Sequence, residues 1–158
     1  MPATAPPRHD ADREISSSRI FAAPPDSVFS AWMDPRGISD WWGPRGFTTT
    51  THEMDFRPGG VWRFTMHGPD GVDYPNQVTY TAIERPRMLA YKHSGGEGHL
   101  HVRFEVTVTF TEEAGKTRMD FRMVFETAEM RNDIAMKYGA VEGLHDTLAR
   151  LGEHLGRG

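Results

Sequence analysis

Apolar and polar side chains alternate most regularly between residues 102 and 125. The apolar positions are Val102, Phe104, Val106, Val108 and Phe110, followed by Met119, Phe121, Met123 and Phe125. Because successive side chains of a β-strand point to opposite faces, this period of two predicts paired strands with one apolar and one polar face. Clusters rich in glycine and proline divide the stretch from 47 to 125 into about six strands. A sheet with one apolar face needs another element to cover it.

A strand and two short helices are predicted before this sheet. The strand runs from Glu14 to Phe21 and is ended by Pro24-Pro25. The first helix presents Val28, Phe29 and Trp32 on one face, and the second carries Ile38, Trp41 and Trp42. Because proline interrupts helical hydrogen bonding, Asp34-Pro35 and Gly43-Pro44 are expected to end the two helices.

The element expected to cover the sheet is a single long helix near the C-terminus. Between Met130 and Leu155 apolar residues recur at helical spacing, and only Lys137 interrupts the stripe. The stripe consists of Ile134, Val141, Leu144, Leu148, Leu151 and Leu155. A helix of about 26 residues is roughly 39 Å long, enough to cross a sheet. The elements therefore predict an α+β fold, a curved antiparallel sheet of about seven strands wrapped around a long C-terminal helix.

Length and local composition favour one domain. A chain of 158 residues can form one hydrophobic core and has little room for a second. We expect this domain at residues 14–156. Residues 1–13 include Pro2, Pro6 and Pro7 among small and charged residues, which is typical of a disordered lead-in rather than a targeting segment.

The overall composition argues against several classes of function. The net charge is −4, and 18 basic residues are scattered among 22 acidic ones, so no nucleic-acid partner is expected. No apolar run approaches the roughly 18 residues of a membrane-spanning helix. The chain has no cysteine, so it has no disulfide or thiolate metal site. This composition is compatible with the reducing cytoplasm, where we expect the protein.

Histidines are the strongest candidates for chemistry. Eight are present, and His99 and His101 would share one face of a strand. A metal ion would need a third ligand, for which His93 and Glu97 are the nearby choices. The neighbouring serine and glycines indicate a flexible loop, which favours exposed histidines. Neither a metal nor another cofactor is predicted.

The other polar residues form no catalytic constellation in the sequence. His52 and Glu53 are adjacent in a predicted strand and therefore point to opposite faces. His145 and Asp146 are neighbours in the predicted helix and point about 100° apart. Hydroxyl nucleophiles are plentiful, but none lies in an elbow-type motif.

The Pro58-Gly59-Gly60 segment is interpreted as a turn rather than a phosphate site, because a strand and not a helix follows it. Its glycines are expected to adopt positive φ and to let the backbone pass close to Trp62 or to Trp41-Trp42. Arg57 and Arg63 flank the turn. They could contact an anion, but pairing with surface carboxylates is the favoured interpretation.

Several short motifs resemble those of a known family. They are Ala31-Trp32-Met33-Asp34-Pro35, Trp41-Trp42-Gly43-Pro44, Asp55-Phe56-Arg57-Pro58-Gly59-Gly60-Val61-Trp62-Arg63-Phe64, Glu84-Arg85-Pro86-Arg87-Met88-Leu89 and Leu148-Ala149-Arg150-Leu151. In order and spacing, the chain from Glu14 to Leu155 resembles the SRPBCC superfamily. Within it, the chain is similar to the bacterial branch homologous to the Aha-type activator of the Hsp ATPase, in its C-terminal-domain-like part. The resemblance implies the START-like helix-grip fold, also described as pollen-allergen-like.

The helix-grip fold implies a ligand cavity, because its sheet curls around the long helix and leaves a space between them. The residues expected to line the cavity are Trp42, Trp62, Phe64, Met66, Tyr80, Phe104, Met119, Phe121, Met123, Val141 and Leu144. For all of these except Val141 and Leu144, simple core packing is the alternative. The family commonly has a Gly-Trp pair in the long helix where this chain has Gly143-Leu144. If this position faces the cavity, the cavity here is larger.

Three functions follow as hypotheses. The leading one is non-catalytic binding of a small hydrophobic or amphipathic molecule, such as a lipid, between sheet and helix. The second, implied by the resemblance, is contact with a chaperone. The third is an enzyme of cyclase, dehydratase or hydrolase type, with Tyr80, Glu53, His52 and Asn76 as candidate polar groups. A homodimer is possible through an edge strand, although no residue requires it.

Overall fold

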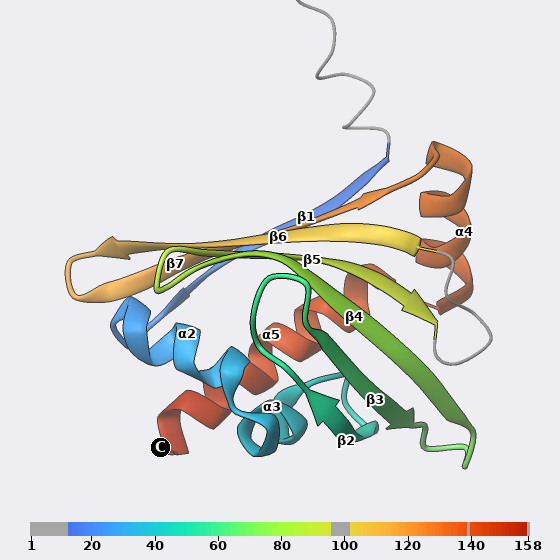
Figure 1. Cartoon of the computed structure of the whole chain (residues 1–158), viewed down its shortest axis with the longest axis horizontal. Helices are drawn as coiled ribbons and strands as arrows, with labels where there is room; N and C mark the ends of the chain where they lie inside the picture. Colours follow the sequence, from blue (N-terminus) through green and yellow to red (C-terminus); the bar gives the residue numbers. More distant parts are fainter. Residues whose placement is uncertain (1–12, 96–101, 139, 158) are drawn as a thin grey trace, which may run out of the picture.

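The computed structural model describes residues 13–95, 102–138 and 140–157. Its strands form one seven-stranded antiparallel sheet in the order β1-β7-β6-β5-β4-β3-β2 (Figure 1). They are β1 (Glu14–Phe21), β2 (Thr48–Met54), β3 (Val61–His67), β4 (Asp73–Glu84), β5 (Met88–Gly95), β6 (Val102–Glu113) and β7 (Lys116–Phe125). Strands β2 to β7 form a meander, and β1 pairs with β7. The predicted curved antiparallel sheet is confirmed.

One polar residue separates the two short helices, α2 (Pro25–Met33) and α3 (Pro35–Trp41). Asp34 is extended because a proline follows it, so α2 ends there. The Asp34 side chain then accepts a hydrogen bond from the Arg36 backbone N–H and caps α3. Trp42 lies just past the end of α3, in an extended conformation, rather than inside the helix as the sequence predicted.

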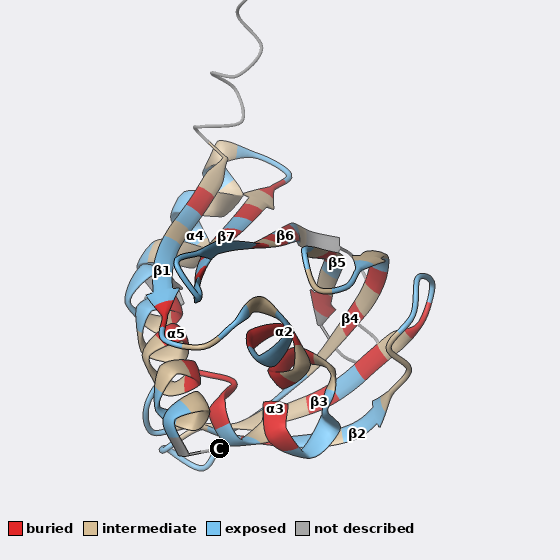
Figure 2. Ribbon diagram, turned by 90° about the vertical axis from the view of Figure 1, so that its left-hand side faces the viewer, coloured by how far each residue is buried: buried red, intermediate tan, exposed pale blue. Residues whose placement is uncertain are grey.

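The sheet curves so that one face is concave, and buried residues gather on that face (Figure 2). On β6 and β7 the predicted alternation is confirmed, because Val106, Val108 and Met119 are buried while Glu105 and Arg118 are exposed. Helix α2 packs against β6 and β7 on the concave side. The core therefore lies between the sheet and the helices that its curvature encloses.

The C-terminal segment forms two helices instead of the single predicted one. They are α4 (Ala128–Tyr138) and α5 (Ala140–Arg157). Both helices contact β1, but α4 also contacts β7 whereas α5 also contacts α2 and α3, so the two segments have partly different neighbours. The sequence has Gly139 between them, and glycine is a poor residue for a helix interior. None of the described helices is long and apolar enough to cross a membrane.

The turn at Gly59-Gly60 lies between β2 and β3, and its backbone is hydrogen-bonded to β4. The Gly59 N–H donates to the Tyr80 carbonyl at 2.7 Å, and the Tyr80 N–H donates to the Gly60 carbonyl at 3.0 Å. Gly59 has a φ of +85°, as expected. A Cβ at Gly60 would lie 2.0 Å from the Asp55 carbonyl oxygen, so the close approach is to Asp55 and not to a tryptophan.

The two arginines beside this turn pair with carboxylates. Arg57 donates to Asp55, and Arg63 donates to Glu53, each at 2.8 Å. All four side chains are substantially exposed. The interpretation of Arg57 and Arg63 as partners of surface carboxylates is therefore confirmed.

Candidate functional site

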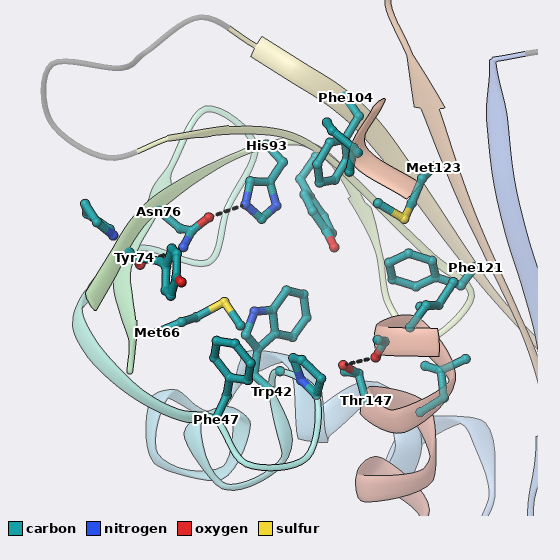
Figure 3. A pocket seen from close by; sticks show the side chains of 18 of the residues that line it. Trp42, Phe47, Met66, Tyr74, Asn76, His93, Phe104, Phe121, Met123 and Thr147 are labelled. Carbon is teal, nitrogen blue, oxygen red and sulfur yellow. Dashed lines mark hydrogen bonds between the residues drawn. The ribbon is translucent and has the colours of Figure 1, made fainter. Parts of the chain in front are cut away.

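A cavity of about 520 Å³ lies between the concave face of the sheet, the loop after α3 and helix α5 (Figure 3). Its volume falls within the roughly 300–1,000 Å³ that is usual for small-molecule sites. The cavity is lined by Trp32, Trp42, Gly43, Pro44, Phe47, Met66, Asp73, Tyr74, Pro75, Asn76, Tyr91, His93, Phe104, Phe121, Met123, Ile134, Gly143, Leu144, Thr147 and Leu148. Aromatic and aliphatic side chains dominate this wall.

Trp42 joins the cavity wall to the aromatic core. Its ring meets Trp32 and Trp62 edge to face, with centroids 5.6 and 4.9 Å apart. Trp32 in turn stacks on Phe121, with an interplanar angle of 26°. Such contacts hold flat side chains in fixed orientations, so this part of the wall is preformed.

Arg150 of helix α5 binds the loop beside Trp42 through several backbone carbonyls. The Arg150 guanidinium donates to five backbone carbonyls at 2.9 to 3.3 Å. These carbonyls belong to Asp40, Trp42, Gly43, Pro44 and Phe47. Backbone acceptors at a helix end and in a loop need such partners when they are partly buried. Arg150 is thus a positioning residue for one side of the cavity.

Polar groups are concentrated at the wall formed by β4 and β5. Asn76 Nδ2 donates to the Tyr74 carbonyl at 2.8 Å, which orients the amide. Asn76 Oδ1 then lies 2.8 Å from His93 Nε2 and accepts a hydrogen bond from it, as the dashed line in Figure 3 shows. Because the amide oxygen can only accept, His93 carries a proton on Nε2.

The side of the cavity near the start of β4 faces solvent. Asp73, Tyr74 and Pro75 are exposed there, whereas Asn76 is half-buried and Val78 is fully buried. Asp73 Oδ1 lies 2.7 Å from Nδ1 of His67, at the outer rim. Burial thus increases along β4, and the entrance lies at the beginning of this strand.

Two tyrosines face each other across β4 and β5, and only one of them lines the cavity. Tyr80 and Tyr91 are paired in the sheet register, with ring centroids 6.5 Å apart. Burial raises the pKa of both phenols, and the Tyr80 neighbour raises that of Tyr91 further. Both are therefore neutral hydroxyls at physiological pH. Tyr91 lines the cavity, while Tyr80 packs against Phe56 with centroids 4.9 Å apart.

The structure divides the eleven predicted cavity residues into three groups. Six line the cavity, namely Trp42, Met66, Phe104, Phe121, Met123 and Leu144. Trp62, Phe64, Tyr80 and Met119 are buried but lie outside the lining, because the aromatic core around Trp42 and Phe56 covers that half of the concave face. Val141 also lies outside the lining. It is in the first turn of α5 and is 36% exposed.

The candidate polar groups for catalysis are not brought together. Asn76 lines the cavity and Tyr80 does not. His52 and Glu53 are exposed on β2, where His52 Nε2 lies 2.8 Å from Thr65 Oγ1 and Glu53 pairs with Arg63. The hydroxyl of Thr147, a lining residue, donates to the Gly143 carbonyl in its own helix.

The metal-site hypothesis concerns residues mostly outside the structure. His99, His101 and Glu97 lie outside the described residues, and the remaining member, His93, lines the cavity. Within the described ranges, no group of three histidine, aspartate or glutamate side chains could hold a metal ion.

Sequence reasoning missed Tyr91 and His93 as cavity residues. A usable signal was present, because Leu89, Tyr91 and His93 alternate along β5 as Val78 and Tyr80 do along β4. Arg150 was also missed as a positioning residue. From the sequence alone, a solvated charged residue next to an apolar stripe cannot be distinguished from one that is hydrogen-bonded to backbone carbonyls.

Solved structures of similar shape come from several bacteria. A protein from Arthrobacter aurescens, determined by NMR in solution, is 27% identical, has a TM-score of 0.86 and aligns over 94% of this chain and 88% of its own. A crystal structure from Mycobacterium smegmatis is 26% identical, with a TM-score of 0.84 and 94% of both chains covered. A crystal structure from Nitrosomonas europaea is 21% identical and has a TM-score of 0.83. The alignment covers 94% of this chain and 97% of that one. The third likeness concerns the fold alone.

The comparison with curated proteins gives no match. The family described as "Activator of Hsp90 ATPase homolog 1-like protein" matches residues 22–156, which include the elements after β1 except the last residue of α5, and the whole cavity lining. Together with the curved sheet, the two short helices and the C-terminal helix, this match shows that the chain belongs to this family within the SRPBCC superfamily.

Proposed function

We propose that the protein binds a small hydrophobic or amphipathic molecule in the cavity between sheet and α5. The observation that carries the proposal is the cavity itself, about 520 Å³ of space lined mainly by aromatic, methionine and aliphatic side chains. Transfer of an apolar molecule from water to such a wall is favourable in proportion to the area it buries. The proposal assigns no reaction to the cavity.

Preorganisation supports the same proposal. The Trp32, Trp42 and Phe121 rings are fixed by mutual contacts, and Arg150 holds the loop that carries Gly43 and Pro44. A wall that is already ordered loses little conformational entropy when a ligand binds. Met66 and Met123 add flexible, polarizable contacts that can adjust to different ligand shapes.

Leu144 offers a direct test, because it is 8% exposed and lines the cavity. The Leu144→Trp variant places an indole in the space that a ligand would occupy. We expect wild-type protein to increase the fluorescence of N-phenyl-1-naphthylamine, a neutral apolar dye, in a saturable titration. We expect Leu144→Trp to weaken this binding at least tenfold, as about 1.4 kcal/mol of lost contact would do.

His145→Trp is the matched control, since His145 is exposed on the same helix and adds an indole outside the cavity. This variant should bind the dye as the wild type does. Equal weakening by both substitutions would place the dye elsewhere. No saturable binding to the wild-type protein would count against the proposed function.

Association with a chaperone is a second candidate function, favoured by the family match over residues 22–156. Its test is the ATPase rate of a purified bacterial Hsp90 measured with increasing amounts of this protein. A saturable change in the rate would support the association. An unchanged rate, together with no co-elution of the two proteins in size-exclusion chromatography, would contradict it.

A further inference from the structure

Tyr91 is a buried polar group on the wall of the cavity. Its side chain is only 2% exposed. It belongs to the cavity lining, and its hydroxyl makes no hydrogen bond to any of the described residues. Tyr80 Oη, in contrast, is fully enclosed by protein atoms and also lacks a partner. The two hydroxyls therefore differ in one respect, because only that of Tyr91 belongs to a residue lining empty space.

The sheet register places Tyr91 deep in the cavity. Along β4 the side chains become progressively buried from Tyr74, which is 38% exposed, through Asn76 to Val78. On β5, His93 pairs with Val78 and Tyr91 pairs with Tyr80. Tyr91 thus lies two residues, or about 7 Å of strand, further from the entrance than His93. A molecule that enters past Tyr74 meets the Tyr91 hydroxyl at its inner end.

The charges on the wall select against anions. Of the lining residues, Asp73 is the only aspartate, glutamate, lysine or arginine, and its negative charge lies at the exposed entrance. Arg150 lies behind the loop and donates to backbone carbonyls. His93 Nε2 donates to Asn76. A carboxylate carried inward would lose its hydration without meeting a fixed cation, which is costly.

Resting on the proposed function, we infer that the ligand is an uncharged molecule with an apolar body and an oxygen acceptor, which accepts a hydrogen bond from the Tyr91 hydroxyl. The acceptor can be a carbonyl, ether or alcohol oxygen. Aromatic rings of Trp42, Phe104 and Phe121 contact the apolar body. A ligand that fills the cavity without supplying an acceptor would leave the Tyr91 hydroxyl without a hydrogen bond, which is unfavourable.

The test compares two ligands of similar shape that differ in one oxygen. Benzophenone has a ketone where diphenylmethane has a methylene group. Their affinities for the wild type, Tyr91→Phe and Tyr80→Phe are measured by isothermal titration calorimetry. We expect Tyr91→Phe to reduce the preference for benzophenone over diphenylmethane about fivefold, the value of one net hydrogen bond. Tyr80→Phe removes a hydroxyl outside the cavity and should leave the preference unchanged.

Diphenylmethane also shows whether the Tyr91→Phe cavity is intact, since its affinity should not change. An unchanged preference in Tyr91→Phe would overturn the inference and leave the proposed function standing. Diphenylacetate should bind the wild type at least tenfold more weakly than benzophenone, and equal or tighter binding would overturn the inference of an uncharged ligand. Failure of all three compounds to bind would contradict the proposed function itself, and the inference with it.

Discussion

Tyr80 shows how a polar atom can be placed at a cost to stability. Its side chain is 3% exposed, and its hydroxyl oxygen is enclosed without a hydrogen-bond partner in the described part of the chain. Phe56 and Tyr91 surround the ring with centroids at 4.9 and 6.5 Å. A buried hydroxyl that makes no hydrogen bond typically costs about 1–3 kcal/mol of the free energy of folding.

Replacement of this hydroxyl by hydrogen should therefore not destabilise the protein. We expect Tyr80→Phe to leave the free energy of unfolding unchanged or to raise it by about 1 kcal/mol, because the desolvation cost disappears while the ring contacts remain. Urea denaturation followed by tryptophan fluorescence measures the change. A loss of more than about 1 kcal/mol would mean that the hydroxyl has a favourable partner.

At the residue scale, the sequence predicts to which face of the sheet a side chain points, but not which other residues pack over it. Phe64 and Phe104 both face inward, yet only Phe104 lines the cavity. The difference arises from a segment distant in sequence, because the ring of Phe64 meets that of Trp42, from the loop after α3, with centroids 5.9 Å apart. Period-two alternation contains no information about these contacts. The role of individual residues in ligand binding remains a prediction.

At the scale of elements, Arg150 connects α5 to the end of α3 and to the following loop. Its guanidinium donates to five backbone carbonyls in this region. Charge-assisted hydrogen bonds are stronger than neutral ones, and carbonyls left without them must be resolvated. Arg150 thus contributes to the orientation of α5 relative to the Trp42 loop.

We expect Arg150→Met to lower the free energy of unfolding by about 3 kcal/mol, since it keeps much of the apolar stem and removes every donor. Urea denaturation measures this loss. Arg45→Met is the control on the same interface, because Arg45 pairs with Glu153 at 2.6 Å while both side chains are about half exposed. A surface ion pair of this kind should contribute at most about 1 kcal/mol to the free energy of unfolding. Equal effects of the two substitutions would contradict the role assigned to Arg150.

The elements themselves follow from the sequence more closely than their connections do. Strands β6 and β7 and the buried leucines of α5 appear where the hydrophobic periods place them. The division between α4 and α5 was not predicted, because one glycine in a long periodic stretch lowers helix stability without requiring a break. Helix α4 packs on β1 and β7, and α5 packs on β1, α2 and α3. These partners are distant in sequence, so a local pattern does not reveal them.

At the scale of the whole molecule, the space on the concave side of the sheet has two parts. One part is filled by α2, α3 and the aromatic side chains around Trp42, and the other contains the cavity beside α5 (Figures 2 and 3). A cavity forfeits packing contacts that a filled core would have, so its presence lowers stability unless a ligand occupies it. Pairing of two chains through an edge strand stays a prediction.

The two facing tyrosines also make global stability depend on alkaline pH. Burial raises the pKa of Tyr80 and Tyr91 above the value of about 10 in an unfolded chain. Below pH 10 both phenols are protonated in the folded and unfolded states, and the native state keeps its full stability. Above pH 10 the unfolded chain releases protons that the folded chain retains. Stability must therefore fall as pH rises, by up to about 2.7 kcal/mol per pH unit for two groups.

The Tyr80→Phe/Tyr91→Phe double variant isolates this effect. It retains the rings and lacks both ionisable groups, while lysines, arginines and the other tyrosines contribute equally in both proteins. Urea midpoints measured from pH 8 to pH 11 should fall more steeply for the wild type than for the double variant, and the two curves should diverge only above about pH 10. Parallel curves would show that other groups cause the alkaline loss. A shallower fall for the wild type than for the double variant would contradict the raised pKa values, because the phenols would then ionise more readily in the folded protein than in the unfolded chain.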